Sequence, residues 1–272
     1  MAQRLHATIR QEVSESSIPD YRHSIRELLQ AGANPSLKVE GKNAMEVADN
    51  ISWDWQQANA RLELTQGGAK ATAQQAQQML QFAAIYGYPQ FMKQALACGA
   101  SPDGQVAESC SISPCRQTSY LYATISGFEC HYDGNPTECV RLLLAAGANP
   151  NRPNTKDGLV PLLCPDCTPE QLELLLQHGA KVNATDTDGR NVLIRKLEQS
   201  FPFRANDIIR ILAAAGINLN HKDNHGKTAL DYATANHTCH LQSPGWHAED
   251  LAKEAATIAL LRELGAQPGN QQ

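Results

Sequence analysis

The residues of this chain best suited to chemistry are Cys164 and Cys167, in the run CPDC. A Cys-x-x-Cys pair can chelate zinc, or it can cycle between a dithiol and a disulfide. The redox alternative needs a strand before the pair and a helix after it. That strand is absent, because residues 159–163 are expected to form a short helix that Pro165 ends. The zinc alternative needs further ligands from elsewhere in the chain.

Three residues could supply such ligands if neighbouring helical pairs stack: Cys130, His131 and Cys139. We expect Cys110 and Cys115 on the opposite edge, out of reach of this cluster. Buried cysteines also serve as small hydrophobic side chains, and we favour inert thiols over zinc or a disulfide. The sequence therefore predicts no cofactor and no metal site, with zinc at these residues as the alternative.

A second group of reactive side chains comprises Cys239, His240 and His247, which lie close together in the sequence. A cysteine hydrolase would need a Cys, a His and an orienting group held together, which proximity in sequence does not provide. We interpret this stretch as a solvated loop. The chain also lacks a Ser-His-Asp signature, a phosphate-binding glycine loop and an HExxH helix. We therefore expect no enzyme, and a zinc- or thiol-dependent enzyme built on inserted loops stays an alternative.

The composition is that of an ordinary soluble protein, with 42% hydrophobic and 19% charged residues and a net charge of −5. No long basic run marks a nucleic-acid surface, so we expect no nucleic-acid partner. No stretch approaches the roughly 18 apolar residues that cross a bilayer, so we expect no membrane partner. The N-terminus lacks the apolar core of a signal peptide. This predicts a cytoplasmic protein with reduced cysteines, although secretion by a signal-less route would leave no mark.

One phrase recurs along the chain: an apolar helical run that ends in Gly-Ala, followed by a polar turn, as in LLQAGANP at 28–35. Glycine suits the residue after a helix because it adopts a left-handed conformation without steric cost. The copies lie 36, 31, 48, 32, 37 and 49 residues apart, which scatters around a unit of about 33 residues. The marking glycines are Gly32, Gly68, Gly99, Gly147, Gly179, Gly216 and Gly265.

Each copy predicts a pair of helices. In the first pair, Leu5, Ile9 and Val13 share one face, and a second helix covers 21–31. The other pairs are expected at 42–50 and 53–65, 74–86 and 89–98, 118–126 and 136–146, 159–163 and 168–178, 190–199 and 204–215, and 227–236 and 249–264. One pair cannot bury its apolar face alone, so neighbours must stack.

We therefore predict a single domain over 1–272. It consists of a cap at 1–32, repeats at 33–68, 69–99, 100–147, 148–179, 180–216 and 217–267, and a polar tail at 268–272. Thr228 is placed to cap the first helix of the last pair. Leu143 and Leu175 are expected in the stacked core.

These repeats resemble the ankyrin repeat family. GAKVNATDTDGRNVL at 179–193 and GINLNHKDNHGKTAL at 216–230 fit the family's register without gaps, and so does the helix pair at 80–100. The departures are Asn191 in place of Thr, Val192 and Ala229 in place of Pro, and Gln81 and Tyr88 in place of His. The resemblance implies an all-α solenoid of about seven stacked helix pairs, joined by hairpin-like turns and interrupted by inserted loops.

The resemblance also implies a protein-binding surface made of hairpin tips and first-helix ends. The residues that it places there are Tyr86, Tyr88, Lys156, Asp157, Thr187, Asp188, Arg190, Glu198, Gln199, Asn224, His225 and Lys227. Exposed Tyr and Arg are typical of interface hot spots. Of Trp53 and Trp55, two apart at a helix start, only one can face the core. We expect Arg190 to be an exposed tip whose replacement leaves stability unchanged.

Three stretches are longer than the family spacing, by about seven residues after Gly99, about eight after Gly127 and about 16 after His237. Such insertions shape a unique surface, which favours one dedicated partner. The predicted function is therefore a binder or inhibitor of one protein, for example a toxin-immunity protein, and a monomer when free. The alternatives are a secreted effector or adaptor that recruits a host or cellular protein, and the enzyme named above.

Overall fold

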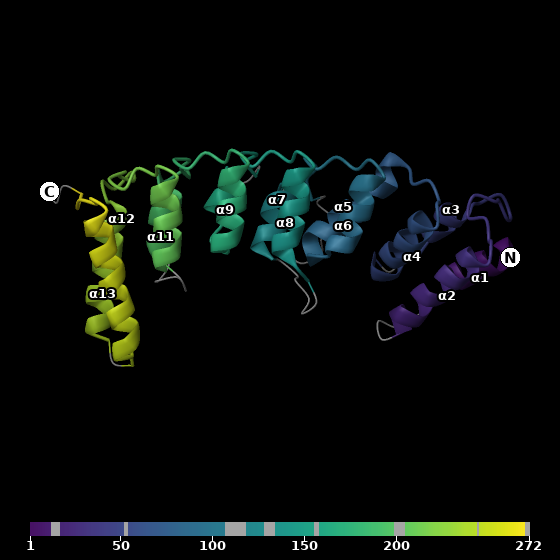
Figure 1. The fold of residues 1–272 in the computed structure, drawn as a ribbon, viewed down its shortest axis with the longest axis horizontal. Helices are drawn as coiled ribbons and strands as arrows, with labels where there is room; N and C mark the ends of the chain where they lie inside the picture. The colour runs from purple at the N-terminus through teal and green to yellow at the C-terminus, as the bar shows by residue number, and fades with distance from the viewer. Residues whose placement is uncertain are drawn as a thin grey trace. The chain divides into compact units, whose positions relative to one another are not determined.

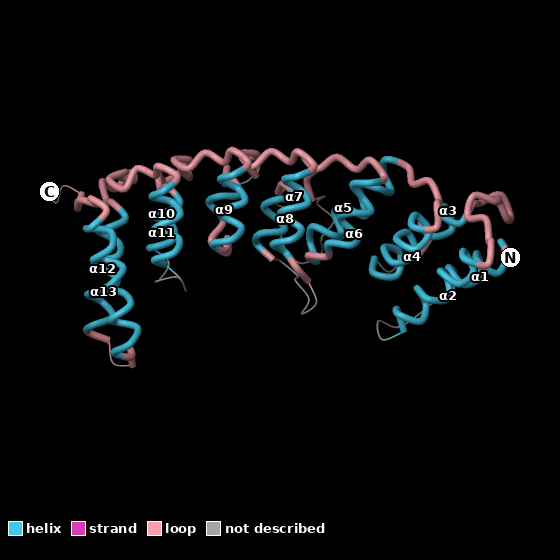
Figure 2. The backbone as a smooth tube through the Cα atoms, viewed as in Figure 1, coloured by secondary structure: helices cyan, strands magenta, loops and turns pink. Residues whose placement is uncertain are grey.

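The structure, a computed structural model, describes residues 1–11, 17–51, 54–106, 118–127, 134–154, 158–198, 205–243 and 245–269. These residues form thirteen α-helices and one 3-10 helix, joined by turns, with no named strand (Figures 1 and 2). Two isolated bridges, Val39 with Lys42 and Thr185 with Asn191, close hairpin-like turns. The all-α class and the ankyrin-type arrangement of helix pairs are thus confirmed for the described part. No helix within it has both the length and the apolar character needed to cross a bilayer.

The chain divides into two compact units, the first comprising residues 1–105 and 128–147. Its helices are α1 (Ala2–Arg10), α2 (Ile18–Gln30), α3 (Ala44–Ala48), α4 (Asp54–Gln66), α5 (Ala73–Tyr86), α6 (Pro89–Ala97) and α8 (Pro136–Ala145). Contacts run within pairs, as between α5 and α6, and between second helices of neighbouring pairs, as between α2 and α4. This is the stacking that a helix pair needs to bury its apolar face.

The second unit comprises residues 106–127 and 148–272. Its helices are α7 (Tyr120–Ser126), the 3-10 helix η2 (Pro161–Leu163), α9 (Pro169–Gln177), α10 (Val192–Glu198), α11 (Ala205–Ala214), α12 (Ala229–Leu241) and α13 (Ala248–Glu263). The first elements η2, α10 and α12 pack in one row, and the second helices α9, α11 and α13 pack in another. That the whole chain forms one domain stays a prediction.

The recurring glycines correctly predicted where the second helices end. All seven marking glycines have φ angles between 80° and 92°. At Gly179 the backbone N–H of Ala180 donates to the carbonyl of Leu175 at 2.9 Å, which closes the end of α9. Thr228 begins α12 as expected, and its backbone N–H donates to the carboxylate of Asp231 at 2.8 Å.

Two predicted elements were wrong. The helix expected at 159–163 is only a three-residue 3-10 turn, because Pro161 starts it and CPDC follows at once. The first helix of the last pair was expected to end at 236, but α12 continues to Leu241. The predicted loop that carries Cys239 and His240 is therefore helical, and family spacing was a poor guide to its end.

Apolar side chains on the helix faces form the core of both units. Leu143 of α8 and Leu175 of α9 are fully buried, as predicted. In the first unit, Leu5 and Ile9 of α1 pack with Ile25 of α2, while Val13 lies outside the described residues. Burying one such side chain contributes roughly 1.5–3 kcal/mol to folding.

Candidate protein-binding surface

Two neighbouring hairpin tips in the second unit share one construction. Each has the sequence Asp-x-x-Gly, at 186–189 and 223–226. In the first tip, the backbone N–H of Asp186 donates to the carbonyl of Arg190 at 3.0 Å. The backbone N–H of Gly189 donates to the carbonyl of Asp186, also at 3.0 Å. The second tip repeats both bonds, from Asp223 to Lys227 at 3.0 Å and from Gly226 to Asp223 at 2.9 Å. Both glycines have a φ of 74°, which only glycine adopts without strain.

A buried aspartate braces each tip from below. One carboxylate oxygen of Asp186 accepts the N–H of Asp188 at 3.0 Å and that of Arg190 at 2.8 Å. Asp223 accepts the N–H of His225 and of Lys227, both at 2.9 Å. Burial alone would raise the pKa of both carboxyls, but these hydrogen bonds and neighbouring donors hold both pKa values below the usual range. The two aspartates were missed as site residues, although the Asp-x-x-Gly pattern marks them.

The tips are also bonded to each other. The backbone N–H of Asn224 donates to the carbonyl of Asp188 at 3.0 Å, and its side-chain Nδ2 donates to Thr187 at 3.1 Å. His221 Nε2 lies 2.7 Å from the carbonyl oxygen of Gly189. The side chains of the predicted site residues Thr187, Asp188, Asn224, His225 and Lys227 are exposed on these braced turns. Their contact with a partner stays a prediction.

Arg190 is not the free tip residue that the sequence predicted. Its side chain is only 21% exposed, and its guanidinium contacts three carboxylates: Asp186 at 2.9 Å, Asp188 at 2.7 Å and Glu198 at 2.8 Å. Arg195 donates to Asp186 as well, at 2.6 Å. The expectation of an exposed arginine was wrong, because three carboxylates surround the side chain, the farthest along the sequence being that of Glu198, the last residue of α10.

Tyr86 and Tyr88 belong to an aromatic cluster in the first unit. Tyr88 is buried, which contradicts its predicted exposure, and its ring lies 5.1 Å from that of Trp55 in an edge-on arrangement. Tyr86 is half-buried, 4.7 Å from the ring of Phe82. An edge-to-face pair such as that of Tyr88 and Trp55 stabilises a fold beyond its area of burial. The cluster is thus part of the packing between helices, and Trp55 is the tryptophan that contributes to it.

Several residues that the sequence analysis singled out lie outside the described residues: Trp53, Cys110, Cys115, Cys130, His131, Lys156, Asp157 and Gln199.

The CPDC turn is closed by a buried lysine. Lys196 of α10 donates through Nζ to the carbonyl of Cys167 at 2.8 Å and to that of Pro165. Burial lowers the pKa of the Lys196 amine, and it raises the pKa of Cys164 to about 11 and that of Cys167 to about 12. Both sulfurs are therefore protonated thiols near neutral pH. A thiolate nucleophile or redox centre needs the opposite shift.

Metal binding at these cysteines has no support from the described residues, where no three metal-ligating side chains are arranged to hold an ion. Cys139 is buried on α8. Cys130 and His131 lie outside the described residues, so the zinc alternative stays a prediction.

The second group of reactive side chains is built differently from a hydrolase. His237 and His240 of α12 both contact the buried carboxylate of Glu254 on α13 through Nδ1, at 2.9 and 2.7 Å. The ring of His240 also stacks on Trp246 at 3.6 Å. Cys239 is exposed on the same helix. The histidines thus orient toward Glu254 and join the last helix pair together.

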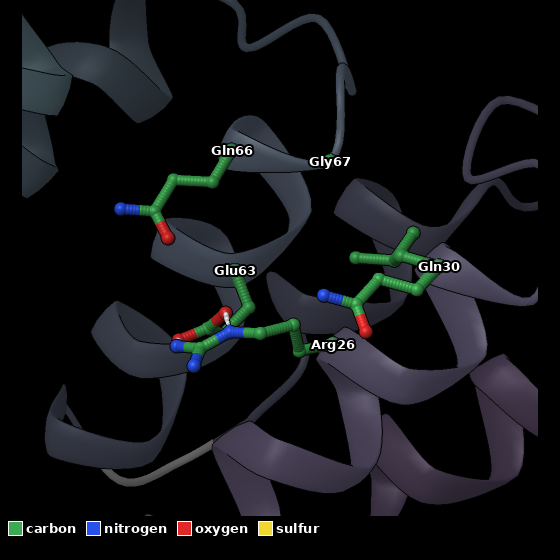
Figure 3. Close-up of a pocket in the computed structure, with 6 residues that line it drawn as sticks. Arg26, Gln30, Glu63, Gln66 and Gly67 are labelled. Atoms are coloured by element: carbon green, nitrogen blue, oxygen red, sulfur yellow. Dashed lines mark hydrogen bonds and ion pairs between the residues drawn. The ribbon is translucent and has the colours of Figure 1, made fainter.

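A cleft lies between α2 and α4 in the first unit (Figure 3). Its volume is about 310 Å³. The residues that line it are Arg26, Leu29, Gln30, Glu63, Gln66 and Gly67. Sequence reasoning missed this cleft, because its lining residues at 26–30 and at 63–67 are more than thirty positions apart in the sequence.

Residues 122–155 match a family model described as Ankyrin repeat. The resemblance inferred from the sequence is confirmed for this stretch, and its extension over the rest of the chain stays a prediction. The curated proteins include none that matches the chain.

Proposed function

We propose that this chain, which contains an ankyrin repeat, binds one dedicated protein partner through the paired tips at 186–190 and 223–227. An ankyrin repeat supports a protein-binding module in general. The finer proposal is that binding is the whole activity: the chain holds its partner stoichiometrically, as an inhibitor or a toxin-immunity protein does, with no reaction of its own.

The observation that carries the proposal is the bracing of the tips. Loops that must order on binding lose affinity, at about 0.5–1.5 kcal/mol for each immobilised side chain. Here the turns are held from below by Asp186 and Asp223, and sideways by Asn224. Thr187, His225 and their neighbours are thus presented on a frame that is already rigid, which reduces the entropic cost of binding.

The shape of the second unit supports a dedicated partner. Its last pair, α12 with 13 residues and α13 with 16, is longer than α10 and α11, with 7 and 10. The extension carries exposed Leu241 and Trp246. A surface formed by helices of such unequal length suits one partner better than a series of interchangeable partners.

The test introduces the same bulky charge at two exposed positions. Thr187→Arg places it on a tip, and Gln177→Arg places it at the end of the second helix α9 as the matched control. Full-length protein purified from its native cells should carry one partner at about one copy per chain. We expect Thr187→Arg to reduce retention of this partner at least tenfold, and Gln177→Arg to retain it. A chain that purifies without a stoichiometric partner, or one that retains it equally in both variants, would overturn the proposal.

A further inference from the structure

The cleft between α2 and α4 has an unusual balance of charge. The carboxylate of Glu63 is 1% exposed, and it accepts from Arg22 Nε at 2.8 Å and from Arg26 Nε and Nη2 at 3.0 and 2.7 Å. Among the described residues, this one carboxylate is the acceptor for both guanidinium groups. Two positive charges against one negative charge leave a net charge of +1 in this three-residue cluster, of which Arg26 and Glu63 line the cleft, while Arg22 contacts Glu63 from outside the lining.

The donors of the cleft remain accessible. The side chain of Arg26 is 47% exposed, although its guanidinium donates to Glu63 through both Nε and Nη2. A guanidinium has five N–H groups, and the bonds to Glu63 occupy only two of those on Arg26. Figure 3 shows Gln30 extending from α2 and Gln66 from α4 on either side of this ion pair. Both amides are exposed and can donate to an incoming acceptor.

One lining residue of the cleft, Leu29, is apolar and lies against a glycine. Leu29 lies beside Gly67, and a Cβ at position 67 would meet Leu29 Cδ1 at 2.7 Å. A larger residue at position 67 would therefore displace the leucine side chain. The cleft thus combines one apolar lining residue, Leu29, with a rim of hydrogen-bond donors from the Arg26 guanidinium and the amides of Gln30 and Gln66.

We propose that this cleft binds the carboxylate side chain of an Asp or Glu residue on the partner protein. The inference rests on the proposed protein-binding function, and it adds a second contact, in the first unit, with a stated chemistry. A carboxylate carries one negative charge, which matches the net charge of +1, and its planar oxygens suit a guanidinium edge. A phosphate would bring about −1.5 to −2 and leave an uncompensated charge beside buried Glu63. Leu29 contacts the methylene stem of the bound side chain.

The experiment uses small probes on the full-length chain, so that it needs no identified partner. N-acetyl-glutamate N-methylamide supplies the carboxylate, and N-acetyl-glutamine N-methylamide is its neutral isostere. Titrations are followed by ¹⁵N NMR at Gly67 and at the side-chain amides of Gln30 and Gln66. We expect saturable shifts with the glutamate probe and at least tenfold weaker binding of the glutamine probe. Inorganic phosphate should also bind at least tenfold more weakly.

Two variants connect the binding to the cleft. Gln66→Glu brings a negative charge to the rim without removing the arginine pair, and it should weaken the glutamate probe at least tenfold. Gln90→Glu adds the same charge at an exposed position on α6 and should leave binding unchanged. Thermal melting shows whether each variant is folded, and Arg26→Gln serves as the replacement should Gln66→Glu unfold.

The inference is overturned if the glutamate probe gives no saturable shift, if the glutamine probe or phosphate binds as tightly, or if both charge variants behave alike. Each of these outcomes concerns the cleft alone. The tip experiment with Thr187→Arg is independent of them, so a failure here is distinguishable from a failure of the proposed function.

Discussion

The side-chain oxygen of Asn183 accepts the backbone N–H of Asn218 at 2.8 Å, and this bond joins one repeat of the second unit to the next. Its amide nitrogen lies 3.4 Å from the carbonyl of Gly216, the glycine that ends α11. Asn151 makes the same pair of contacts one repeat earlier, with Lys181 at 2.8 Å and Gly179 at 2.9 Å. A repeated side-chain bridge therefore supplements helix packing, and it pairs backbone groups that lie beyond the helix ends.

Replacing this bridge should loosen the second unit. We expect Asn183→Ala to lower the free energy of unfolding by about 1 kcal/mol, because two exposed hydrogen bonds each give a modest net contribution. Gln177→Ala, a change at an exposed position of α9, should stay within about 0.5 kcal/mol of wild type. Urea denaturation followed by circular dichroism measures both. Equal stability of the two variants would show that the bridge contributes nothing.

Arg190→Ala should destabilise the second unit by about 1–2 kcal/mol. The substitution leaves Asp186, whose side chain is 2% exposed, with Arg195 and two backbone N–H groups, so the loss is smaller than for an unpaired buried charge. Lys253→Ala is the control, because Lys253 pairs with acidic residues on its own helix surface and is largely exposed. Thermal melting checks the pair, and an Arg190→Ala protein that melts with wild type contradicts the role assigned to the network.

The sequence predicted helix ends and turns better than it predicted contacts between side chains. The end of α9 was predictable, because the need for a left-handed residue is local and Gly179 meets it. The tip register was also predictable from the Asp-x-x-Gly spacing. The reach of Arg190 to Glu198 was not, since an arginine at a tip can extend into solvent or fold back, and the choice depends on charges brought close by the fold.

The burial of Tyr88 and the existence of the cleft likewise depend on contacts between segments that are far apart in the sequence. An aromatic residue after a helix-ending glycine is exposed or buried according to what the neighbouring pair presents, and here Trp55 covers it. The cleft depends on Arg26 meeting Glu63 across two helices, 37 positions apart in the sequence. No local pattern encodes such a meeting.

Acid should destabilise the first unit through His6. This side chain is 1% exposed, and neither ring nitrogen has a hydrogen-bond partner among the described residues. Burial, with a smaller effect of nearby Arg10, lowers the pKa of His6 below 6.5. The unfolded chain then binds a proton that the folded chain resists, so stability is full above about pH 6.5 and declines as pH falls toward the folded pKa. The slope for one proton is at most about 1.4 kcal/mol per pH unit.

The variant His6→Leu should lose less stability than wild type between pH 7.5 and pH 5, as measured by urea denaturation at each pH. His23→Leu is the control, since His23 is exposed on α2 beside Glu27. An unchanged pH profile in His6→Leu would show that the imidazole is hydrated or partnered in solution.

The cysteines should differ sharply in reactivity toward iodoacetamide at neutral pH. Only the thiolate reacts, and burial raises the pKa of Cys164 to about 11 and that of Cys167 to about 12. Cys239 is exposed on α12. We expect Cys239 to be alkylated in the native protein while the CPDC pair is protected, and both classes to react once urea unfolds the chain. Peptide mass spectrometry over time gives the three rates, and native labelling of Cys164 or Cys167 as fast as Cys239 would reopen thiol chemistry at this turn.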